Sequence, residues 1–101
     1  MFLIQILLPR QGAGGAALDG QVAKTRAELT EKFGGVTAYE RAPAKGAWVT
    51  PEGEIERDDV VMVEVVATAF DREWWREYRS RLEERFAQRE IHVRALGIVI
   101  P

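Results

Sequence analysis

The sequence has no cysteine, and this absence excludes several kinds of chemistry. Disulfide bonds, thiolate metal sites and cysteine nucleophiles all need a residue that the chain lacks. The absence also fits a reducing compartment. We therefore expect a cytoplasmic protein that folds around its core without covalent staples.

Histidine and serine occur once each, as His92 and Ser80. A serine in the middle of a helix usually bonds its own backbone, so a Ser-His-Asp triad is nearly ruled out. A metal site would need several carboxylates beside the single imidazole, and the sequence does not cluster them. We therefore predict neither a metal ion nor a cofactor.

The chain has neither a large net charge nor a long apolar run. The net charge is −2, which gives no overall attraction to nucleic acid or to an anionic membrane. The apolar run at residues 2–8 is far shorter than the roughly 20 residues that span a bilayer. No basic segment precedes this run, so it is a poor signal peptide. We expect neither nucleic acid nor a membrane as a partner.

The residues that are present indicate an ordinary folded chain. Of 101 residues, 47% are hydrophobic and 30% are charged, a globular balance rather than a disordered one. A chain of this size can bury one core, and no linker interrupts it. We predict one domain over residues 1–101.

The stretch 70–90 has the clearest pattern, which is typical of a helix. Asp71 is a good N-cap, because its carboxylate can accept from the free amides of the first turn. Phe70 before it and Trp75 after it can form a hydrophobic staple. Four residues spaced by three, four and four form one apolar stripe: Trp75, Tyr78, Leu82 and Phe86.

The other segments complete an alternating pattern of strands and helices. Residues 2–8 predict a central strand buried on both faces, and residues 16–33 predict a helix that ends at Gly34. Residues 36–41 predict an edge strand that continues at 47–50 past a kink, because Pro43 interrupts it. Further strands are expected at residues 55–67, strong only from Val60, and at 91–100. This order is that of the ferredoxin-like β-α-β-β-α-β sandwich, an α+β fold whose antiparallel sheet has the order 4-1-3-2 and both helices on one face.

The sheet face away from the helices is unusually apolar in this prediction. Alternation along the strands places on it Leu3, Gln5, Leu7, Thr37, Tyr39, Arg41, Val60, Met62, Glu64, Val66, His92, Arg94, Leu96 and Ile98. An exposed apolar patch of this extent usually marks an interface. A second copy of the same sheet is the simplest cover, so we predict a homodimer through this face.

Several stretches give the chain a resemblance to a known family. They are Phe33-Gly34-Gly35-Val36-Thr37, then Gly46 with Trp48, and then Tyr78, Leu82, Phe86, Gln88 and Glu90. On these residues the chain resembles a family of short bacterial proteins of unknown function with a ferredoxin-like or dimeric α+β barrel fold. The resemblance implies the fold and the dimer, and it supplies no catalytic residue.

A polar cluster on the open sheet face is the first candidate site. His92 is the one side chain whose unperturbed pKa suits proton transfer near neutrality, and Arg94 lies beside it on the same face. Glu64 is expected to pair with Arg41 across the hairpin, and Gln5 and Tyr39 are their neighbours. The alternative is that these residues are a solvated strand start and a structural cross-strand pair.

The tryptophans and the glycine-rich loop are weaker candidates. Trp74 lies off the helix stripe beside Tyr78, and we expect it to be half exposed. Tryptophan is enriched at interfaces and in ligand pockets, although Trp48 and Trp74 could simply cover the edge of a small core. Residues 12–17 match Gly-x-Gly-x-x-Ala after a strand, as in dinucleotide-binding folds. Three residues separate this motif from the strand, and a flexible connection is the preferred interpretation.

Two function hypotheses follow from these patterns. The first is a non-catalytic binding or interaction module. The second is a cofactor-independent enzyme acting on a small organic substrate in a pocket between the sheet and a dimer partner, with His92 as base and Arg94 or Arg41 as anion stabiliser. A closed pocket around His92 would favour the enzyme, whereas a filled sheet face would favour the module.

Overall fold

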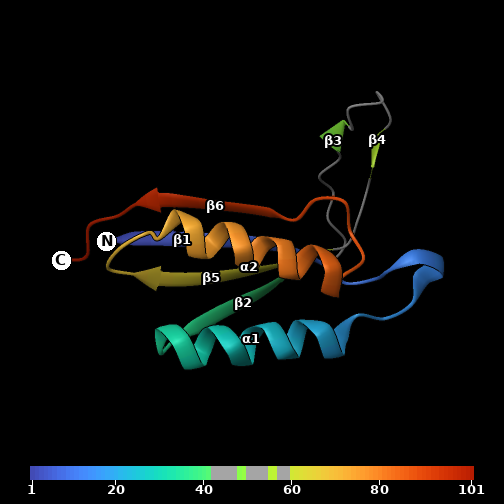
Figure 1. Cartoon of the computed structure of the whole chain (residues 1–101), viewed down its shortest axis with the longest axis horizontal. Helices are drawn as coiled ribbons and strands as arrows, with labels where there is room; N and C mark the ends of the chain where they lie inside the picture. Colours follow the sequence, from blue (N-terminus) through green and yellow to red (C-terminus); the bar gives the residue numbers. More distant parts are fainter. Residues whose placement is uncertain (42–47, 50–54, 57–59) are drawn as a thin grey trace.

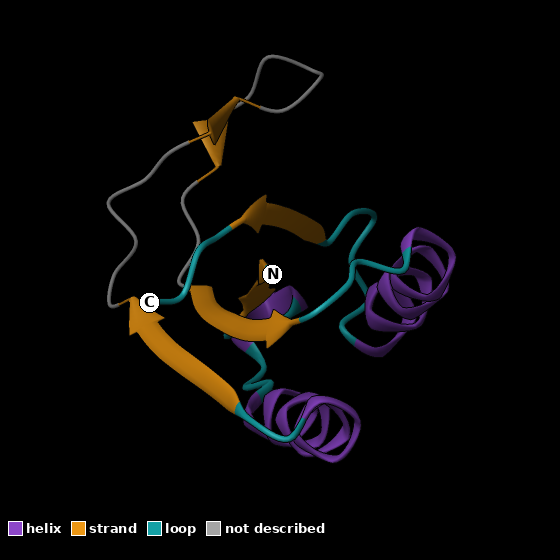
Figure 2. Cartoon of the chain, turned by 90° about the vertical axis from the view of Figure 1, so that its left-hand side faces the viewer, coloured by secondary structure: helices purple, strands orange, loops and turns teal. Residues whose placement is uncertain are grey.

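The computed structural model describes residues 1–41, 48–49, 55–56 and 60–101. Within these ranges one sheet is covered on one side by two helices (Figure 1). Figure 2 shows the same layers end-on, with both helices on the same side of the sheet. No helix in the described ranges has the length and apolar character needed to cross a membrane.

The elements are β1 (Phe2–Pro9), the 3₁₀ turn η1 (Ala13–Gly15), α1 (Asp19–Phe33), β2 (Val36–Arg41), β3 (Trp48–Val49), β4 (Ile55–Glu56), β5 (Val60–Ala67), α2 (Arg72–Arg85) and β6 (His92–Gly97). The strands of the main sheet and the two helices follow the predicted order, whereas the expected strand at 55–67 is divided into β4 and β5. The main sheet is antiparallel, with strand order β2-β5-β1-β6. The predicted ferredoxin-like topology is therefore confirmed, because this order is 4-1-3-2 read from the other edge.

The segments β3 and β4 do not belong to this sheet. They pair with each other in a separate two-stranded ladder, in which Trp48 is opposite Glu56 and Val49 is opposite Ile55. The prediction that residues 47–50 continue the edge strand is therefore wrong for Trp48 and Val49. Residues 47 and 50 lie outside the described ranges.

The start of α2 is set by local chemistry that the sequence predicts. The Asp71 carboxylate accepts a 3.1 Å hydrogen bond from the Trp74 amide, which satisfies one of the free donors of the first turn. The rings of Phe70 and Trp75 stack at 6.4 Å between centroids, so the predicted staple is present.

The end of α2 comes earlier than the predicted residue 90. Ala87 has a φ of 51°, the left-handed conformation that stops a helix. The Gln88 amide then donates to the Glu83 carbonyl at 2.9 Å, and the Ala87 amide donates to the Glu84 carbonyl at 3.2 Å. This pattern is a Schellman motif, built here without the glycine that usually announces it in a sequence.

The core lies between the sheet and the helices. Its buried members include the whole predicted stripe of α2 and the helix-facing residues of the central strands: Trp75, Tyr78, Leu82, Phe86, Ile4, Ile6, Leu8, Val61, Val63 and Val65. From α1 the core takes Leu29, with Thr25 fully buried beside it. The expected strand at 91–100 is shorter in the structure, because β6 ends at Gly97 and Val99 is 94% exposed.

Candidate functional site

A row of three polar side chains crosses the sheet face opposite the helices. The strand register places Gln5 of β1 directly between Glu64 of β5 and Arg94 of β6. The Gln5 amide nitrogen donates to the Glu64 carboxylate at 2.7 Å, and the Arg94 Nε donates to the Gln5 amide oxygen at 2.6 Å. We call these three residues the polar row.

The polar row has opposite charges at its two ends. Glu64 carries a negative charge on one side of β1, and Arg94 carries a positive charge on the other side. Gln5 joins them through its two amide atoms, one donating and one accepting. The arrangement fixes both charged side chains on a surface where each is at least partly exposed.

An apolar surface begins next to the polar row, toward the end of the sheet where β1 starts. Leu3 lies opposite both Val66 and Leu96 in the register, and Ile98 extends the series beyond β6. We call Leu3, Val66, Leu96 and Ile98 the end patch. Val66 is 40% exposed and Leu96 is 46% exposed, whereas Val60 and Met62 near the other end of the same face are already buried.

An open depression of about 670 Å³ lies at the β5 side of the end patch. Beside it, β2 begins at Val36, opposite Val65, so the last two residues of β5 have no pairing partner in β2. Leu3, Val66 and Phe33 supply apolar surface, and Glu64 and Thr37 supply polar atoms. The lining is therefore mixed, with somewhat more apolar than polar surface.

The structure places His92 near these residues but not in contact with them. His92 begins β6 and lies opposite Leu7 in the register, one row away from the polar row. Its side chain is exposed, and no described residue forms a hydrogen bond or ion pair with it. Catalysis by His92 and Arg94 therefore stays a prediction, and only Arg94 of the two has a polar partner among the described residues.

The predicted pairing of Glu64 with Arg41 is wrong. In the register Glu64 lies opposite Thr37, and Arg41 lies opposite Val60. The prediction treated residues 36–50 and 55–67 as the two strands of one hairpin, whereas Val49 and Ile55 pair in a separate ladder. It therefore misplaced the register of β2 against β5 by four residues. Tyr39 lies opposite Met62 and one row from the polar row, and the backbone of Trp48 belongs to the separate β3–β4 ladder.

Trp74 belongs to the helix layer, on the opposite side of the sheet from the polar row. Its ring stacks on Tyr78 at 4.8 Å between centroids, and the Lys32 ammonium lies 4.5 Å from its ring. It lines a shallow hollow between the helices together with Glu28 and Arg81. Trp74 is thus half-buried, as expected, but it shares no site with His92, Arg94 or Glu64.

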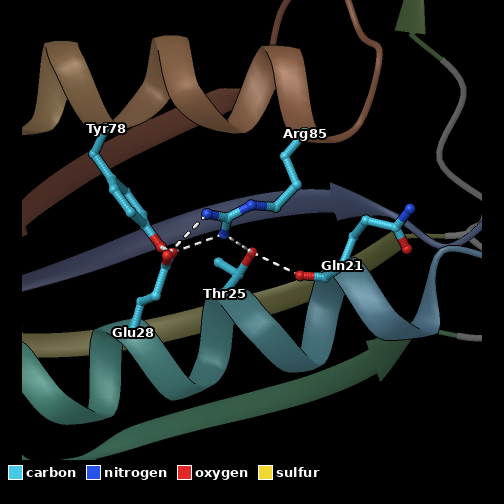
Figure 3. A network of polar contacts seen from close by, with 5 residues as sticks. All are labelled: Gln21, Thr25, Glu28, Tyr78 and Arg85. Carbon is cyan, nitrogen blue, oxygen red and sulfur yellow. Dashed lines mark hydrogen bonds and ion pairs between the residues drawn. The ribbon is translucent and has the colours of Figure 1, made fainter.

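A second polar network connects the two helices (Figure 3). Glu28 of α1 accepts from both terminal nitrogens of Arg85 of α2, at 2.7 and 2.9 Å, and from the Tyr78 hydroxyl at 2.9 Å. Arg85 also donates to the Thr25 hydroxyl at 2.9 Å, and that hydroxyl donates to the Gln21 carbonyl at 2.8 Å. The bidentate geometry indicates a structural clamp between α1 and α2.

Contacts within the clamp and burial shift the pKa values of Glu28 and Tyr78. The Arg85 hydrogen bonds lower the pKa of Glu28 below its usual 4.5. Burial, reinforced by the hydrogen bond to Glu28, raises the pKa of Tyr78 to about 12. Tyr78 therefore stays neutral and donating at physiological pH. Sequence analysis missed this network, because Glu28 and Arg85 are 57 positions apart and each resembles a solvated helix charge.

Carboxylates and the histidine do not gather into a metal site within the described ranges, where no group of three such residues could hold an ion. The open face carries one carboxylate, one guanidinium and an adjoining apolar surface.

Comparison with known proteins supports the fold and leaves the function open. No protein-family model and no curated protein matches the chain. A solved structure of similar fold is a phage SAM lyase in complex with S-methyl-5′-thioadenosine, with a TM-score of 0.61. The sequences are 14% identical, and the match covers 94% of this chain and 79% of the other. At this identity the likeness shows the fold alone.

Proposed function

We propose that this protein is a homodimeric interaction module in which two copies pack face to face through the open side of the sheet. The observation that carries the proposal is the polar row, in which Glu64 and Arg94 lie directly opposite Gln5 on its two sides. Such a row is complementary to itself, as the interface of a two-fold dimer must be.

A two-fold axis along β1, midway between two sheets about 10 Å apart, pairs the opposite charges of the two polar rows. This operation keeps each residue at its level along the strand and exchanges the two sides of β1. Glu64 then faces Arg94 of the partner subunit, and the reciprocal pair forms at the same time. The same axis brings the two end patches together, so apolar surface is removed from water beside the paired charges.

Charge reversal tests this arrangement. We expect Glu64→Arg alone and Arg94→Glu alone each to weaken dimerisation at least roughly tenfold, because two like-charge contacts replace two attractive ones. Analytical ultracentrifugation over a concentration series would measure the dissociation constant.

The matched control is the double variant Glu64→Arg with Arg94→Glu. It restores opposite charges across the interface, and Gln5 can hydrogen-bond either order by turning its amide. We expect its dissociation constant to return close to the wild-type value. Equal dissociation constants for the wild type and all three variants would refute this packing of the two sheets.

The second candidate is a cofactor-independent enzyme acting on a small organic substrate between the sheet and its partner. Its support is the depression, whose 670 Å³ falls in the range of small-molecule pockets, and the similar fold of a SAM lyase that binds S-methyl-5′-thioadenosine. In this case Glu64 would contact the ligand, His92 would transfer a proton and Arg94 would stabilise an anion.

Isothermal titration calorimetry with S-methyl-5′-thioadenosine separates the two candidates. Saturable binding by the wild type that is lost in Glu64→Gln would favour the small-molecule site. The module hypothesis expects no binding, because the partner sheet occupies the face. Incubation with SAM, followed by mass spectrometry of the products, extends the test to turnover.

A further inference from the structure

We propose that the depression beside Val66 is a socket for Leu96 of a second copy, and that residues 98–101 of that copy lie across its outer rim. This inference rests on the proposed face-to-face dimer and specifies how its two copies engage. It concerns the end patch rather than the charged row that carries the dimer itself.

Val66 and Leu96 lie at the same position along the direction of the strands. Val66 and Leu96 both lie opposite Leu3, on either side of β1. A two-fold axis along β1 exchanges the two sides and preserves the level. Leu96 of the partner subunit therefore stands directly over Val66, at the edge of the depression.

The exposed side chain of Leu96 matches the apolar part of the depression. Leu96 lies on the edge strand β6, and its apolar side chain is 46% exposed. The depression offers apolar walls from Leu3, Val66 and Phe33, and its volume is about 670 Å³. One leucine side chain fills only part of that space, so further apolar groups are needed to exclude water from it.

The segment after β6 can supply these groups. The Ile98 amide donates to the Met1 carbonyl at 2.9 Å, which holds this segment in line with the sheet. Beyond it, Val99 is 94% exposed and Ile100 is 55% exposed. In the dimer these side chains pass the end of β5 of the opposite copy, where Gly35 and Phe33 line the depression.

Cross-linking gives a direct test, because the natural chain has no cysteine. Two single-cysteine variants, Val66→Cys and Leu96→Cys, would be mixed and treated with a bismaleimide about 10 Å long, which matches the sheet spacing. We expect a cross-linked pair containing one copy of each variant. In the matched control Ser80→Cys on the exposed surface of α2 replaces Val66→Cys, and no such pair should form with it.

Affinity provides an independent readout. We expect Leu96→Ala, and separately a chain that ends after Gly97, to raise the dimer dissociation constant at least tenfold, whereas Ser80→Ala leaves it unchanged. Circular dichroism would confirm that each variant keeps its fold. If the wild type is a dimer but the variants show neither the mixed cross-link nor any loss of affinity, the socket is wrong and the dimer remains. A monomeric wild type overturns the proposed dimer and the socket with it.

Discussion

Replacing Phe86 with alanine is expected to lower the free energy of unfolding by about 3–5 kcal/mol. Phe86 is 1% exposed and closes the apolar stripe of α2 against the sheet. The large-to-small change removes buried apolar surface and leaves a cavity that the rigid sheet cannot fill. Urea denaturation at a fixed protein concentration would measure the loss.

The matched control for Phe86→Ala is Arg79→Ala, an exposed position on the same helix. Alanine favours helix, and a surface change of this kind usually stays within about 0.5 kcal/mol. A loss below about 1 kcal/mol for Phe86→Ala would show that α2 does not anchor the core as described.

Replacing Arg85 with methionine is expected to cost about 1.5–3 kcal/mol at pH 7, the range for hydrogen bonds to charged groups. Methionine keeps the apolar stem but leaves the Glu28 carboxylate without its two strongest donors. The arginine side chain is 12% exposed and that of Glu28 is 33% exposed, so water replaces these bonds only in part.

This effect should depend on pH in a defined direction. The pKa of Glu28 is lower in the folded protein than its usual 4.5, so the clamp stabilises the fold fully above that value. The stabilisation is lost as the pH falls through the folded pKa, when Glu28 takes up a proton. The difference between the wild type and Arg85→Met should therefore shrink between pH 7 and about pH 3.

Urea denaturation at both pH values, with Arg76→Met as the control, tests the clamp. Arg76 is exposed on the same helix, and its substitution should have little effect at either pH. A stability difference for Arg85→Met that stays constant with pH would contradict an ionic clamp through Glu28.

Much of the fold is predictable from local chemistry. Asp71 marks the start of α2, and Gly34, with a φ of 85°, ends α1 where the sequence predicts. The end of α2 is not predictable in this way, because Ala87 adopts a conformation for which its sequence carries no signal. The start of α1 is also later than predicted, since the loop turns through Gly14 and Gly15 before Asp19.

The candidate site was only partly predictable. Alternation along a strand shows which face of the sheet a side chain is on, but it does not show which residue of the next strand lies beside it. The sequence places Gln5, Glu64 and Arg94 on one face, but only the strand register aligns them as a row. The expected pairing of Glu64 with Arg41 fails for the same reason, because the observed register places Glu64 opposite Thr37. The Glu28–Arg85 clamp depends on the packing of two helices far apart in the chain, which no local pattern contains.

The central claim is that two copies meet through the open face of the sheet, and the mass of the wild-type protein in solution tests it most directly. Light scattering coupled to size-exclusion chromatography at micromolar concentration should give about twice the 11.4 kDa of one chain. A mass of one chain under these conditions would contradict the account.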